Sequence, residues 1–157
     1  MRGVFVLASS FNQDLSTWDV SKVTNMGYMF SSAKAFNQGL SNWDVSAVTD
    51  MDSMFLSASA FNQGLSKWDV SAVTDMGNMF LRAFAFNQDL SKWDVSAVTD
   101  MAFMFEDATA FNRELCGEAW VKSKADKTDM FMNSPGSISS TVYTKPKPGY
   151  GGDKEYC

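Results

Sequence analysis

A 25-residue repeat governs what this chain can fold into. The stretch FNQGLSNWDVSAVTDMDSMF begins at Phe36, and the nearly identical FNQGLSKWDVSAVTDMGNMF begins at Phe61. A fixed period of this length is typical of a solenoid, in which each repeat buries its apolar face against the next repeat. We therefore expect the phenylalanines that open the repeats to form one continuous buried column. These are Phe11, Phe36, Phe61, Phe86 and Phe111.

Within one repeat, the pattern predicts a short strand, a turn and a short helix. LSNWDV has the L-x-x-L-x-L spacing of a leucine-rich-repeat strand, with Trp43 at a leucine position. After a turn at Ser46, the apolar residues Met51, Met54 and Phe55 follow at helical spacing. The predicted fold class is an α/β solenoid, a leucine-rich-repeat-like stack of short parallel strands and short helices. An all-β solenoid is the alternative.

The repeat pattern divides the chain into three parts. Residues 1–112 hold a partial first coil and four 25-residue repeats, and residues 113–134 form a divergent C-terminal capping repeat in which Trp120 comes two residues late. Residues 135–157 are rich in Pro, Gly and Ser and read as a tail. Because MRGVFVLASSFNQ aligns with MGYMFSSAKAFNQ, the first coil begins inside a repeat. Its edge should expose apolar surface and invite association.

Composition argues against several classes of function. The chain carries a net charge of −5 and no histidine. Nucleic acid is not an expected partner, because phosphate binding needs clustered Lys and Arg. Without histidine there is no Ser-His-Asp triad and no His-based zinc site, and no Gly-rich phosphate loop is present. We expect a protein that is not an enzyme and uses no cofactor.

Two features bear on the compartment without deciding it. No apolar run approaches the roughly 20 residues of a membrane span, and none near Met1 is long enough for a secretory signal. The two cysteines, Cys116 and Cys157, lie outside the regular repeats, where a disulfide between them would fasten the tail to the cap. Two cysteines alone do not fix the redox compartment.

Two further repeated residue types are expected to serve the structure. Stacked Asn side chains can hydrogen-bond the backbone of neighbouring coils, although a polar ligand-binding ladder is the alternative. Methionines at helical spacing beside phenylalanine are expected to fill the core rather than bind a soft metal. The asparagines are Asn12, Asn37, Asn62, Asn87 and Asn112, and the methionines are Met26, Met29, Met51, Met54, Met76, Met79, Met101 and Met104.

An outward-facing column of aspartates is the candidate binding surface. Stacked at about 4.8 Å, ionised aspartates repel one another. Either each one accepts hydrogen bonds from the following turn, near its Ser, or a cation such as Ca²⁺ bridges Asp44 and Asp69. We favour the turn, and expect no metal. The candidate residues are Asp19, Asp44, Asp69 and Asp94, with Asn42, Lys67 and Lys92 beside them.

The stretch FNQDLSTWDVSKVTNMGYMFSSAKAFNQ resembles the BspA-like surface-protein repeat, a leucine-rich-repeat-like family of bacterial surface lipoproteins that also occurs in some protists and algae. The resemblance runs from Met1 to about Asn112. It implies a binding or adhesive surface for a protein or glycan, at the cell surface or outside the cell, and it supplies no catalytic residues. The alternative function is a structural subunit docked in a larger assembly through its first coil.

Overall fold

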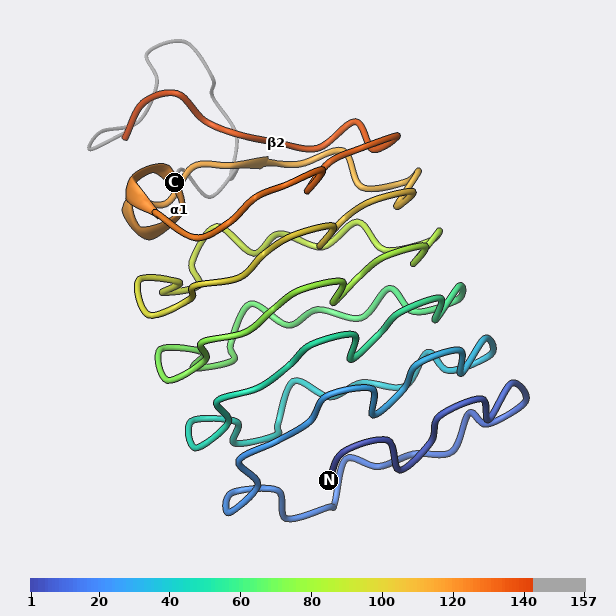
Figure 1. Cartoon of the computed structure of the whole chain (residues 1–157). Helices are drawn as coiled ribbons and strands as arrows, with labels where there is room; N and C mark the ends of the chain where they lie inside the picture. Colours follow the sequence, from blue (N-terminus) through green and yellow to red (C-terminus); the bar gives the residue numbers. More distant parts are fainter. Residues whose placement is uncertain (143–157) are drawn as a thin grey trace, which may run out of the picture.

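The computed structural model describes residues 1–142. Over this range the chain winds as a stack of coils, with the first coil at one end and α1 and β2 at the other (Figure 1). Parallel bridges join consecutive coils at one position, from Asn25 to Asp50, then to Asp75, Asp100 and Asp126. Residues that repeat every 25 positions in sequence therefore stack in space. A disulfide between Cys116 and Cys157, which the sequence leaves open, would involve a residue outside the described range.

Regular helices and strands are found, among residues 1–142, only from residue 114 onward. Strand β1 (Glu114–Leu115) pairs in parallel with β2 (Ser137–Ile138), and helix α1 (Glu118–Lys122) comes between them in the chain. The short helix expected in every repeat is therefore absent. The expected L-x-x-W-x-V strand is absent too, because Trp43 N–H donates to Leu40 O and closes a turn there. The assignment to a leucine-rich-repeat-like or an all-β solenoid stays a prediction.

Successive tight turns take the place of the expected helix. Met29 N–H donates to Met26 O at 3.1 Å, and the third residue of this turn, Tyr28, has a φ of +58°. The next N–H, on Phe30, instead donates to Met54 O of the following coil at 2.9 Å. Positive φ at the third position is the geometry of a type II turn. The turns space the apolar residues as a helix would, while alternate N–H groups join neighbouring coils. The same left-handed position recurs at Ser53, Asn78, Phe103 and Asp129.

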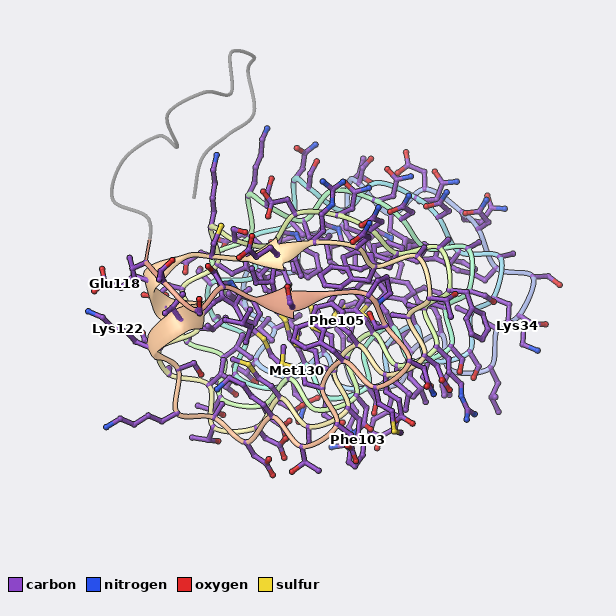
Figure 2. All side chains as sticks on the ribbon, turned by 90° about the horizontal axis from the view of Figure 1, so that it is seen from above. Lys34, Phe103, Phe105, Glu118, Lys122 and Met130 are labelled. Carbon is purple, nitrogen blue, oxygen red and sulfur yellow. The ribbon has the colours of Figure 1, made fainter. Side chains whose placement is uncertain are left out.

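Stacked phenylalanine rings fill the interior. The ring centroid of Phe61 lies 5.9 Å from that of Phe36 and 6.1 Å from that of Phe86. From Phe36 to Phe111 these rings are fully buried, which confirms the predicted column, although Phe11 at its end is only half-buried. Viewed down the stack, Phe105 of a second column and Met130 lie inside the outline, whereas Lys34 lies at the rim (Figure 2). The second column consists of Phe5, Phe30, Phe55, Phe80, Phe105 and Phe131.

Polar groups at the coil junctions are paired between coils. Asn62 N–H donates to Asn37 Oδ1 at 3.0 Å, and Asn62 Oδ1 accepts the N–H of Asn87 at 2.9 Å. This confirms the structural interpretation of the repeated asparagines. The indole N–H of Trp68 likewise donates to Leu40 O of the preceding coil, at 2.9 Å. Within the described residues no buried side-chain nitrogen or oxygen lacks a hydrogen bond, as a stable interior requires.

All eight repeated methionines are fully buried, which confirms their role as core filler.

The last coil extends into the stretch that the sequence assigned to a tail. Strand β2 lies beyond residue 134, and Ser139 N–H donates to Leu115 O at 2.9 Å. Phe131 also stacks on Phe105, with the ring centroids 5.5 Å apart. The described part of the expected tail therefore lies along the capping coil. The remainder of that stretch, from residue 143, is outside the described residues.

The first coil exposes apolar side chains at its outer edge. Phe5 stacks on Phe30 as expected, with ring centroids 5.4 Å apart, yet Val4, Val6 and Leu7 are 49%, 46% and 73% exposed. We expect the purified chain to self-associate in light scattering as its concentration rises. The double variant Val6→Ser, Leu7→Asn should scatter as a monomer, because Asn also tolerates the left-handed backbone of Leu7. A monomeric wild-type chain at high concentration would contradict this expectation.

Candidate binding surface

We use the name Asp–Ser column for four aspartates and the serines that follow each of them by two residues. In the second coil, Asp44 Oδ1 accepts the N–H of Ser46 at 3.1 Å and its hydroxyl at 2.6 Å. The same N–H bond holds the other three aspartates, at 3.0 Å in each case. All four aspartates are exposed. The members are Asp19, Asp44, Asp69, Asp94, Ser21, Ser46, Ser71 and Ser96.

The turn serines keep the column ionised. The hydroxyl of Ser46, and then its N–H, hold the pKa of Asp44 below its usual value, whereas the charges of Asp69 and Asp19 act weakly in the opposite direction. The pKa values of the other three aspartates are lowered by the same two bonds. Hydrogen bonds to a carboxylate favour its charged form. The column is therefore a line of fixed negative charges, relieved by local turns as the sequence predicted.

The other predicted surface residues are also exposed, but they lie on turns rather than on a strand face. Asn42 sits in the turn that the bond from Trp43 N–H to Leu40 O closes, and Lys67 sits in the equivalent turn of the next coil. Lys92 follows in the third such turn and is likewise exposed. The prediction of a strand face was wrong because the L-x-x-W spacing is that of a turn here. The exposed positions that it assigned are nevertheless correct.

A pocket of about 680 Å³ lies at the end of the Asp–Ser column. Asp94 and Ser96 line it together with Glu118 and Lys122, which are bonded to each other. Figure 2 shows Glu118 and Lys122 on α1, at the edge of the stack. The other lining residues are Ala97, Val98, Thr99, Ala119, Ser123, Lys124 and Ala125.

This pocket was not foreseen from the sequence. The two-residue delay of Trp120 was its signal, because the extra residues allow α1 to form where the regular coils carry an Asp–Ser turn. The indole N–H of Trp120 still donates to Leu90 O at 2.9 Å, so the core continues beneath the change. The pocket therefore lies where the chain departs from the regular 25-residue repeat.

Adding Ca²⁺ should leave the melting temperature unchanged. Within residues 1–142 no group of three or more His, Cys, Asp or Glu residues is placed to hold a metal ion, and Asp44 Oδ1 already accepts two bonds from Ser46. A ligand stabilises a fold only when it prefers the folded state. The measurement is thermal unfolding with and without Ca²⁺. A rise in the wild-type chain that disappears in the double variant Asp44→Asn, Asp69→Asn would turn the column into a calcium site.

The comparisons with known proteins place the chain in a family. The family described as "Mycoplasma protein of unknown function, DUF285" matches residues 1–70 and 38–142. The chain belongs to DUF285. The two DUF285 matches together span the same residues as the stacked coils. Neither the curated proteins nor the solved structures gave a match. The helix of this DUF285 chain, α1, has five residues, and within the described range no helix has the length and apolar character to cross a membrane.

Proposed function

We propose that the chain is a non-enzymatic solenoid module that presents an extended surface for protein or glycan binding, of the BspA-like kind found in surface and adhesion proteins. The observation that carries the proposal is the Asp–Ser column. It repeats one exposed, rigidly held carboxylate in four successive coils and ends at a pocket. Repetition of a group at one spacing favours a partner that is itself extended or repetitive, since several weak contacts then act together.

The electrostatics of the column support binding over catalysis. Acid–base chemistry on paired carboxylates needs environments that push the two pKa values apart, with one group kept protonated as the acid. In the Asp–Ser column all four pKa values are instead lowered by the same turn. Four ionised carboxylates are suited to accept hydrogen bonds from sugar hydroxyls or from Lys and Arg of a protein partner.

Binding to a glycan array and to a panel of purified matrix proteins tests the proposal. A ligand of the wild-type chain should bind the double variant Asp44→Asn, Asp69→Asn at least about tenfold more weakly, a loss of roughly 1.4 kcal/mol. Asn retains the turn-forming oxygen, so the variant should keep its fold. The control Glu106→Gln, Asp129→Asn removes the same charge away from the column and should bind normally. Equal binding by both variants, or hydrolysis of a glycan on the array, would contradict the proposal.

A further inference from the structure

A second column of carboxylates lies at the bridges between coils. We call Asn25, Asp50, Asp75 and Asp100 the junction column; each of them is half-buried. Each Oδ1 accepts the N–H two residues further on, at 3.0 Å for Asn25, Asp50 and Asp75 and at 2.8 Å for Asp100. The side chains therefore occupy the same turn in four successive coils.

The first member of the junction column shows how neighbours can be joined. The Nδ2 of Asn25 donates to Asp50 Oδ2 at 2.6 Å, so a neutral side chain bridges to the next carboxylate. From Asp50 onward every member is a carboxylate, and two ionised carboxylates have no proton to share. Both carboxylates nevertheless approach Gly77. A Cβ built on Gly77 would lie 3.4 Å from Asp75 Oδ1 and 3.5 Å from Asp100 Oδ1.

Negative charge faces Asp75 from both sides. Asp50 and Asp52 act on it from the preceding coil and Asp100 from the following coil. Within the described residues, no cation contributes to the pKa shift of Asp75; Arg2 Nη1 lies 3.8 Å from Asp50 Oδ2, one coil away. Burial raises the pKa of Asp75, the N–H of Gly77 opposes the rise, and the three neighbouring aspartates add to it.

We propose that Asp75 is an acid-sensitive clasp between coils, which takes up a proton in acidic solution and donates it in a hydrogen bond to Asp100. The proton comes from solvent, and the new bond has the geometry that Asn25 already forms with Asp50. Protonation also removes one of the stacked charges. Asp75 therefore stabilises the stack more in acidic solution than at neutral pH.

The sign of the effect separates this clasp from the Asp–Ser column. A carboxyl group with a raised pKa contributes stability that is complete below its unfolded pKa, near 3.8, and is lost as the pH rises through the folded pKa. The exposed aspartates, with lowered pKa values, contribute stability above about 3.8 that is lost only in more acidic solution. The interval from pH 8 down to about pH 3.8 therefore reports on Asp75 rather than on the exposed column.

Thermal unfolding of Asp75→Asn across this interval tests the proposal. The amide keeps the bond from Gly77 N–H and supplies a permanent donor to Asp100, as in the Asn25 turn, which is also followed by a glycine at Gly27. At pH 8 the variant should melt about 2–4 °C above the wild-type chain, and the difference should shrink as the pH falls toward 3.8. The control Asp44→Asn removes the same charge from the exposed column and should not show this convergence. A constant difference between Asp75→Asn and the wild-type chain at all pH values would overturn the proposal.

A second measurement needs no variant. The carboxyl carbon of Asp75 can be followed by NMR through an acid titration of the wild-type chain, with Asp44 as the internal comparison. The midpoint for Asp75 should lie above 3.8 and that for Asp44 below it. A midpoint for Asp75 at or below 3.8 would overturn the clasp even if Asp75→Asn failed to fold.

Discussion

Replacing Phe61 with alanine should lower the free energy of unfolding by about 3–5 kcal/mol. The ring is fully buried and stacks on Phe36 at 5.9 Å, on Phe86 at 6.1 Å and on Phe55 at 4.0 Å. Its removal leaves a cavity in its own column, next to Phe55 of the second column, and the bridged coils on either side cannot collapse to fill it. Urea denaturation of the wild-type chain and the variant measures the difference.

The matched control is Phe84→Ala. Phe84 is 48% exposed and belongs to neither phenylalanine column, so its loss should change the free energy of unfolding by no more than about 0.5 kcal/mol. Similar losses for the two variants would mean that the buried columns do not carry the stability of the stack. A small loss for Phe61→Ala would have the same meaning.

Replacing Gly117 with alanine should cost about 1–3 kcal/mol and disturb the capping coil. A Cβ on Gly117 would lie 2.2 Å from the backbone oxygen of Ser91 and 3.5 Å from Cδ1 of Trp120. Because the closest atom belongs to the backbone, the start of α1 must move away from the preceding coil. Urea denaturation measures the cost, and the fluorescence of the tryptophans reports the disturbance.

Gly39→Ala is the control for that experiment. Nothing lies within 4 Å of a Cβ at Gly39, so the change should be neutral or should stabilise the chain by up to about 1 kcal/mol through the unfolded state. If Gly117→Ala proved as harmless as Gly39→Ala, then α1 would not be seated against Ser91. The pocket beside α1 would then have no fixed wall.

The period of the sequence was sufficient to predict which residues lie inside. Phe61, Met51 and Asn62 each recur in register, and the stack places each set in a column with the predicted role. The reason is physical: when every coil must bury the same face against its neighbour, a residue type kept at one position meets its own copies. This inference needs the repeat length, but it does not need the correct local backbone.

The local backbone could not be predicted, because the period of the repeat does not distinguish a helix from a series of turns. Met51, Met54 and Phe55 have helical spacing, but a series of turns gives the same spacing. In such a series, alternate N–H groups also donate hydrogen bonds to the next coil. The left-handed positions include Tyr28 and Phe103, which are residue types that rarely adopt positive φ. Beyond the first coil, Asn78 is the one Asn at this repeated position and Gly occurs at none of the five, so the usual sequence signal for such turns was missing from most repeats.

The candidate surface was predicted in its exposed residues but not in its full extent. Asp44 and its equivalents were expected on the outside and held by the following serine, as they are. The pocket was missed because α1 is a single irregular insertion, and one divergent coil has no repeats to compare with. The junction column was not predicted, because a helix was expected at Met51, Met54 and Phe55, whereas a turn there holds Asp50 at a bridge to Asp75.

Solution NMR of the aromatic side chains tests the stacked arrangement most directly. The account predicts nuclear Overhauser contacts between residues 25 apart, such as Phe61 with Phe36 and Phe86, together with positive-φ coupling constants at Ser53 and Ser57. A helix from Met51 to Ala58 would instead give contacts between residues three apart. Such contacts, without those between successive phenylalanines of the column, would contradict the account.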